Sequence, residues 1–172
     1  MPTLTRLIGT LMLSGAFWPA IAATNTPWAD LIECKKTVDD YQTIAEQALS
    51  GDSPMPGISK IANDNAFMAE YQLAQPIQVQ GFSTRRIAFA GNAVLAILDT
   101  ADAASLARKH GMDIALNTPN KFMASKTVTS GADADGLRQE ISLNASTVTT
   151  HPGKTLFGCS YKTIYPEDAI EL

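Results

Sequence analysis

Two cysteines, Cys34 and Cys159, are the only ones in this 172-residue chain, and they lie near its two ends. In a protein exported to an oxidising compartment, a lone pair of cysteines predicts a disulfide. Such a bond would close a loop over most of the chain and stabilise the fold by roughly 4–5 kcal/mol in the chain-entropy description. The competing interpretation, a catalytic thiol, would need a nearby base and an open pocket. We expect Cys34 and Cys159 to be joined.

The N-terminal segment has the pattern of a secretory signal peptide. Arg6 supplies the positive charge, residues 7–18 are uncharged and mainly apolar, and residues 20–22 form an A-x-A cleavage pattern. The apolar run is too short to span a bilayer as a helix, and a buried N-terminal helix is the minor alternative. We expect residues 1–22 to be removed and residues 23–172 to form a single periplasmic or secreted domain.

The net charge of the chain limits the kinds of partner that it can bind. The chain carries a net charge of −4, and loss of Arg6 makes the mature protein more acidic still. Nucleic acids and anionic lipids demand a basic face, so neither is an expected partner. After signal cleavage we expect no stable membrane insertion and no cofactor.

Residues 26–50 have the pattern of one long amphipathic helix. Thr26-Pro27 is a favourable start and Gly51 a favourable end. Apolar residues recur at alternating steps of three and four, which places them on one helical stripe: Leu31, Cys34, Val38, Tyr41, Ala45 and Ala48. The stripe predicts that Cys34 faces the core.

From residue 69 onward the pattern changes to the period of two that is typical of strands. Gly91-Asn92 predicts a tight hairpin turn between residues 85–90 and 93–98. The second arm is apolar at every position, which favours a central strand covered on both faces. A short helix is expected over residues 101–110, with Arg108, Lys109 and His110 in its last turn, where cations complement the helix dipole. Further strands are expected near residues 112–116, 122–129, 141–147 and 157–161.

These elements predict an α+β domain with an antiparallel β-sheet of about five to six strands. The long N-terminal helix would pack on one face of the sheet, and one short extra helix would accompany it. Phe157, Cys159 and Tyr161 alternate along the last strand and therefore share a face. If that face packs against the helix, Cys159 on the alternating strand lies opposite Cys34 on the apolar stripe of the helix.

The stretch 151–162, HPGKTLFGCSYK, contains residues that could form a reaction centre. Gly153-Lys154-Thr155 resembles the end of a phosphate loop, but Val148 stands where another glycine is required, and the triplet lies between two strand patterns. His151 could act as a general base, although no local motif supplies a nucleophile. We interpret the stretch as a turn, with His151 exposed, followed by a strand.

Two acidic pairs are candidates for a metal site or a catalytic site. Asp133-Ala134-Asp135-Gly136 resembles part of a calcium-binding loop. However, Gly131 and Ser142 occupy the first and last ligand positions, where acidic residues are needed. Asp39-Asp40 is expected on a solvated helix face, so a glycosidase-type carboxylate pair is a minor alternative. No metal site is predicted.

The favoured functional hypothesis is a non-catalytic binding protein, such as an inhibitor, an immunity protein against an exported toxin, or an envelope accessory factor. Loops on a rigid scaffold commonly carry binding, and the loops 51–57, 130–136 and 151–154 contain the candidate contact residues: Asp52, Met55, Asp133, Asp135, His151 and Lys154. Acidic loops favour a basic partner among envelope or exported proteins.

The alternative is a small exported hydrolase. His151 would be its base, with Asp133 or Asp135 as the acid or metal-binding group. This hypothesis requires the fold to bring those residues within hydrogen-bond reach.

Overall fold

The protein is described from a computed structural model that covers residues 27–50, 55–63 and 65–165. The expected signal peptide, the expected N-cap Thr26 and Asp52 lie outside these residues. The helices are α1 (Pro27–Ile32), α2 (Val38–Leu49) and α3 (Ala103–Lys109). The strands are β1 (Ile58–Ile61), β2 (Ala69–Val79), β3 (Phe82–Ala90), β4 (Ala93–Leu98), β5 (Asp113–Thr118), β6 (Lys121–Ala132), β7 (Arg138–Ser146) and β8 (Thr155–Ile164).

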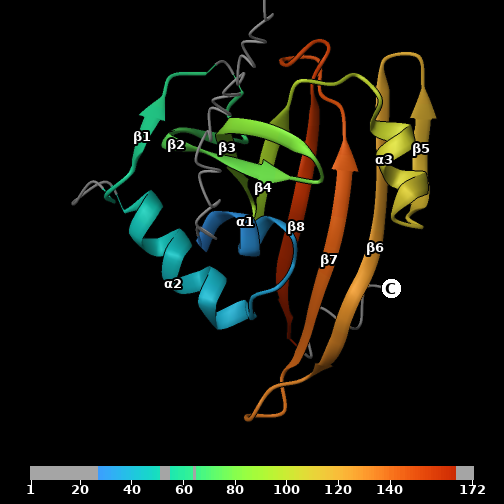
Figure 1. The fold of residues 1–172 in the computed structure, drawn as a ribbon. Helices are drawn as coiled ribbons and strands as arrows, with labels where there is room; N and C mark the ends of the chain where they lie inside the picture. The colour runs from blue at the N-terminus through green and yellow to red at the C-terminus, as the bar shows by residue number, and fades with distance from the viewer. Residues whose placement is uncertain (1–26, 51–54, 64, 166–172) are drawn as a thin grey trace, which may run out of the picture.

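The strands form one eight-stranded sheet in the order β1-β2-β3-β4-β8-β7-β6-β5, and the neighbouring strands pair antiparallel. The α+β class is confirmed, but the expected count of five to six strands is wrong. Residues 58–61 pair with β2 as an edge strand, which is not among the strands expected from the sequence. Figure 1 shows that the sheet twists strongly, since β2 and β3 run across the view while β6 and β7 run along it.

The helices pack on one face of the sheet. All three helices contribute to one hydrophobic core with the face that carries Tyr71, Ile87 and Phe157, which we call the helix face. The opposite face, called the back face, carries Glu70, Arg86, Ala88, Leu95, Ile97 and Leu156. Strand β4 lies between β3 and β8 and is buried from Val94 to Leu98, so the predicted central strand is confirmed.

The prediction of one long N-terminal helix is wrong, because two short helices occupy this segment. The first ends at Ile32, and Cys34 follows with a positive φ of 58°, which a right-handed helix cannot contain. A capping box then starts α2: the Thr37 hydroxyl accepts from the Asp40 amide, and the Asp40 carboxylate accepts from the Thr37 amide. Cys34 therefore lies in a turn rather than on a helical stripe.

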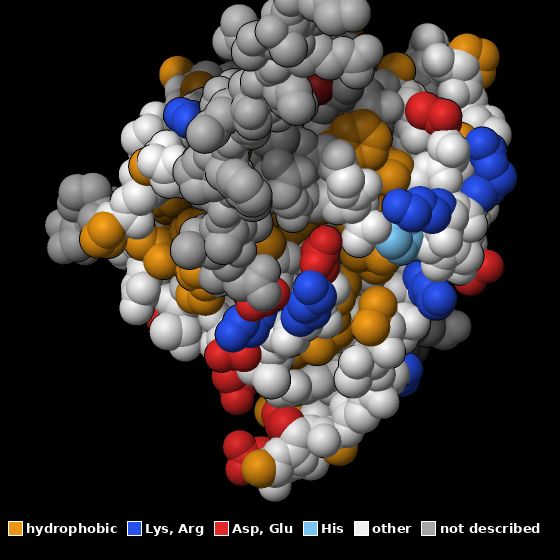
Figure 2. All heavy atoms as spheres, viewed as in Figure 1, with side chains coloured by type: hydrophobic (Ala, Val, Ile, Leu, Met, Phe, Trp, Pro, Cys, Tyr) orange, Lys and Arg blue, Asp and Glu red, His pale blue; other side chains and the backbone are white. Residues whose placement is uncertain are grey.

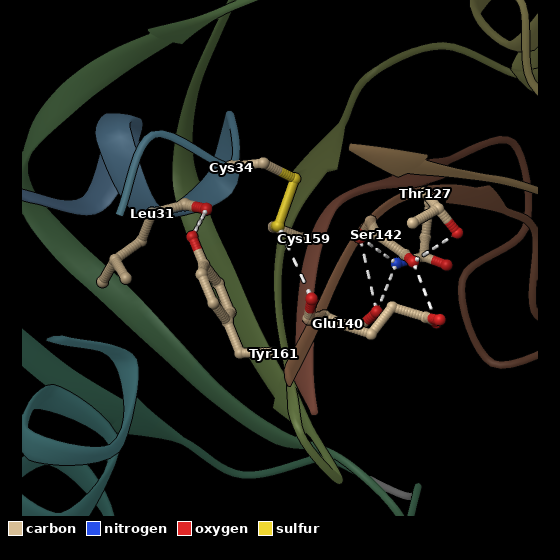
Figure 3. Close-up of a disulfide and its surroundings, with 9 residues drawn as sticks. Leu31, Cys34, Thr127, Glu140, Ser142, Cys159 and Tyr161 are labelled. Atoms are coloured by element: carbon tan, nitrogen blue, oxygen red, sulfur yellow. Dashed lines mark hydrogen bonds between the residues drawn. A yellow bond between two sulfur atoms is a disulfide. The ribbon is translucent and has the colours of Figure 1, made fainter. Parts of the chain in front are cut away.

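The disulfide between Cys34 and Cys159 is present, with a Cα–Cα distance of 5.3 Å (Figure 3). The last strand presents Phe157, Cys159 and Tyr161 to the helices, as predicted. The buried Tyr161 hydroxyl donates to the Leu31 carbonyl at 2.7 Å, one turn before the disulfide (Figure 3). The turn after α1 is therefore fixed to β8 by a covalent bond and a hydrogen bond together.

None of the helices in the described residues has both the length and the apolar character needed to cross a membrane.

Candidate functional site

The predicted contact residues fall at two ends of strand β7. Asp133 and Asp135 lie in the hairpin that joins β6 to β7, whereas His151 and Lys154 lie in the connection from β7 to β8. The Asp133 carboxylate accepts from the backbone amides of Asp135 and Leu137, so it stabilises its own turn. The structure does not bring Asp133 or Asp135 to His151. Met55 is half-buried before β1 and packs against the core.

The connection from β7 to β8, residues 147–154, is called the 147–154 loop. It is fastened at both ends. Thr147 exchanges two hydrogen bonds with the backbone of Phe122, each 3.0 Å long. At the other end the Thr155 hydroxyl donates to the Thr100 carbonyl at 2.7 Å, and Lys154 forms an ion pair with Asp99. The residues between these ends are therefore held in one place.

His151 is buried, with 7% of its surface exposed, so the prediction of an exposed turn residue is wrong. Its Nε2 lies 2.6 Å from Oε1 of Glu70, a strand β2 residue with 0% exposure. Strand β2 is the third strand from β8 in the sheet, which corresponds to about 14 Å in a flat sheet. The loop therefore folds back across the back face to reach Glu70.

The hydrogen bonds around His151 form a consistent chain of donors and acceptors. A carboxylate only accepts, so Nε2 donates to Glu70. At the other side of the ring, Nδ1 lies 2.9 Å from the Thr150 hydroxyl, which also accepts a 3.4 Å bond from the Asn65 side chain. With a neutral ring, the Thr150 hydroxyl donates to Nδ1 and every group in the chain has a partner of the right kind.

Arg86, on the neighbouring strand β3, supplies the charge that balances Glu70. Its Nη2 lies 2.5 Å from Oε2 of Glu70. Both oxygens of this buried carboxylate are thus occupied, one by His151 and one by Arg86. The Arg86 side chain remains 40% exposed, while its Nε is buried without a hydrogen-bond partner among the described residues.

Cavities lie on both sides of the 147–154 loop. One has a volume of about 420 Å³ and is lined by Ala62, Asn63, Glu70, Arg86, Thr150, His151, Pro152 and Lys154. The other, about 590 Å³, lies between the same loop and the segments 101–104 and 117–122. His151, Pro152 and Lys154 line both cavities. Pro152 and Gly153 are exposed, so the tip of the loop stands between two hollows.

A third hollow, about 680 Å³, lies on the helix face between α2 and the end of β8. Tyr41 and Tyr161 stack at its base with ring centroids 4.9 Å apart. Burial raises the pKa of Tyr41 to about 12, so its hydroxyl stays protonated at neutral pH and donates to the Gly91 carbonyl. This hollow offers aromatic and apolar contact area.

His110 is the C-cap residue of α3, and its ring lies 5.4 Å from that of Phe157. Burial lowers the pKa of His110, and the nearby charges of Lys109 and Lys126 lower it further. Figure 2 shows lysine and arginine side chains gathered around a histidine on the side of α3. His110 contacts Phe157, whereas His151 contacts Glu70 and Thr150, so the two histidines have different neighbours. Among the described residues, no group of three or more potential metal ligands occurs.

Sequence reasoning missed Glu70, Arg86 and Thr150. In the alternation of β2, Tyr71 and Leu73 mark the core side, which places Glu70 on a face expected to be solvated. Arg85-Arg86 has no spacing that distinguishes a buried contact from an exposed one. No pattern in the sequence links either strand to residue 151.

No family model matches this chain, and no curated protein and no solved structure matches it significantly.

Proposed function

We propose that this protein is exported to the periplasm or beyond and acts by binding another exported or envelope protein, without catalysis. Roles as an inhibitor, an immunity protein or an envelope accessory factor share this mode of action. The disulfide supports export, because such bonds persist in oxidising compartments.

One observation carries the proposal. The 147–154 loop is anchored beneath by the buried bond between His151 and Glu70, while Pro152 and Gly153 are exposed between two cavities. A loop already held in one conformation loses little conformational entropy when it docks. Hollows on both sides allow a partner to surround the tip, which increases the area buried in the complex.

The hairpin that carries Asp133 and Asp135 is a second proposed contact, suited to a basic partner. It lies at the other end of β7, so a partner of ordinary interface size would engage the loop or the hairpin as its main site. The loop is the stronger candidate because two cavities adjoin it.

Site-specific photo-crosslinking tests the proposal. A photoreactive residue at Pro152 is expected to capture one protein from the native envelope, whereas the same residue at Lys162, which is exposed on β8, is not. With the captured protein purified, Pro152→Asp and Lys154→Glu are expected to weaken binding at least tenfold, and Lys162→Glu to leave it unchanged. Equal capture at both positions, or equal affinity in all variants, would contradict the proposal.

A small exported hydrolase is the second candidate, and one observation favours it. Thr150, His151 and Glu70 form a hydroxyl–imidazole–carboxylate chain that lines the 420 Å³ cavity. In that role the Thr150 oxygen would attack an acyl carbon while its proton passes to Nδ1 of His151, which would return it to the departing group; water would then hydrolyse the acyl-threonine. The Arg86 contact argues against it, because the guanidinium already neutralises the carboxylate that would stabilise a charged imidazole. A fluorophosphonate probe distinguishes the two roles: a hydrolase is labelled at Thr150, and His151→Ala abolishes the labelling.

A further inference from the structure

We infer that the 420 Å³ cavity beside the 147–154 loop is a binding site for an oxyanion, a carboxylate or a phosphate group, with Arg86 and Lys154 as its cationic contacts. The inference concerns a small ligand and does not depend on the proposed protein partner.

The donors and acceptors at the cavity wall are out of balance. Glu70 is the acidic residue that lines the cavity, and both of its oxygens are already occupied. Of the five N–H donors of a guanidinium, only those on Nη2 of Arg86 have a partner among the described residues. Among the side chains that line the cavity, the unused hydrogen-bonding capacity is therefore on the donor side, at Nη1 and the buried Nε of Arg86, and a ligand that accepts is the complementary one.

The charged groups at the cavity differ in how accessible they are. Glu70 is fully buried behind Arg86, whereas the Arg86 side chain is 40% exposed. Lys154 lines the same cavity and is 34% exposed, and its partner Asp99 is 78% exposed. An exposed ion pair of this kind contributes little stability, so Lys154 is free to exchange Asp99 for a bound anion. The accessible charge at the cavity is thus cationic although the cluster as a whole is neutral.

Buried contacts hold the Arg86 guanidinium and the 147–154 loop in place. Glu70 fixes the Arg86 guanidinium from behind, and the same carboxylate fixes His151 and hence the loop that carries Lys154. Planar guanidinium groups held in this way recognise carboxylate and phosphate geometry with two parallel hydrogen bonds. Glu70 thus positions the Arg86 guanidinium directly and the backbone of Lys154 through the loop.

The test is an NMR titration of the full chain with acetate, with inorganic phosphate and with neutral acetamide, at constant ionic strength. The Arg86 Nε–H signal and the backbone amides of residues 150–154 are followed. Acetate, phosphate or both are expected to give saturable shifts confined to these signals, and acetamide none. Whichever anion binds more tightly identifies the ligand as a carboxylate or a phosphate.

Variants make the assignment specific. Arg86→Gln and Lys154→Gln are expected to weaken the anion at least tenfold, while Arg85→Gln, the same charge change on the exposed opposite side of β3, leaves it unchanged. Because Arg86→Gln disturbs the buried Glu70, Lys154→Gln provides an independent variant at the rim of the cavity. The inference is overturned if no saturable shift occurs, or if Arg85→Gln has the same effect as the two cavity variants.

Discussion

Nε2 of His151 lies 2.6 Å from Oε1 of Glu70, and the two residues are 81 positions apart in the chain. This contact joins the 147–154 loop to strand β2 across the back face of the sheet. With Arg86 on the second oxygen, it forms a buried polar cluster whose members depend on one another. Removal of Arg86 leaves the buried Glu70 charge without its counter-ion, whereas removal of His151 leaves one buried carboxylate oxygen without a donor.

His151→Ala is therefore expected to lower the free energy of unfolding by about 2–3 kcal/mol, because one Glu70 oxygen loses its donor and the buried ring leaves a cavity. Urea denaturation of the wild type, His151→Ala, Glu70→Gln and the double variant gives the coupling between the two residues, expected at about 1–3 kcal/mol. Arg85→Gln is the control, because an exposed charge change alters stability by about 0.5 kcal/mol or less. A coupling near zero would contradict the assigned contact.

The disulfide is expected to be a major source of stability. Replacement of both Cys34 and Cys159 by alanine should lower the free energy of unfolding by about 4 kcal/mol, because the bond closes a loop of 125 residues in the unfolded chain. Reductant should destabilise the wild type by a similar amount and leave the double variant unaffected. Labelling of either thiol in the folded, unreduced protein would show that the bond is absent.

Gly158 tests the close approach of β4 and β8. A Cβ at this position would lie 2.2 Å from the Val94 carbonyl oxygen and 2.8 Å from the Leu95 Cα, and both are backbone atoms. Gly158→Ala should therefore cost about 3 kcal/mol or more, since the central pair of strands must separate. Gly131→Ala in β6, where a Cβ would meet nothing within 4 Å, should be nearly neutral by thermal or urea denaturation. Equal stability of the two variants would argue against the strand pairing at Gly158.

His110 should make the stability depend on pH. Because its folded pKa is lowered by burial, the unfolded chain binds the proton more readily. Its contribution is complete above the unfolded value of about 6.5 and is lost as the pH falls through the lower folded pKa. Lys109 and Lys126 act in the same direction as burial, and Glu33 opposes them.

The measurement is urea denaturation at pH 7.5, 6.5 and 5.5 for the wild type and His110→Asn. The wild type should lose more stability than the variant over this range, and the difference between the two is the contribution of His110. Parallel pH profiles would show that His110 is not the group responsible.

Local patterns in the sequence were sufficient for several elements of the fold. Gly91-Asn92 forms the predicted hairpin turn, the apolar run 93–98 is the central strand β4, and the alternation of the last strand places Cys159 on the helix face. The break between α1 and α2 also had a sequence signal, since Thr37 and Asp40 have the spacing of a capping box. The helical stripe across this break suggested one helix because apolar spacing alone does not record where a helix stops.

The sequence by itself determined the α+β class, because helical and strand periodicities are properties of neighbouring residues. It also determined the pairing of Cys34 with Cys159, because the chain has two cysteines. Only the tertiary structure decided that β2 and the 147–154 loop meet. The period-two pattern of β2 assigns Glu70 to a face but does not say what covers that face. What covers Glu70 is determined by the twist of the eight-stranded sheet and by the path of the 147–154 loop. Both depend on contacts between residues far apart in the chain.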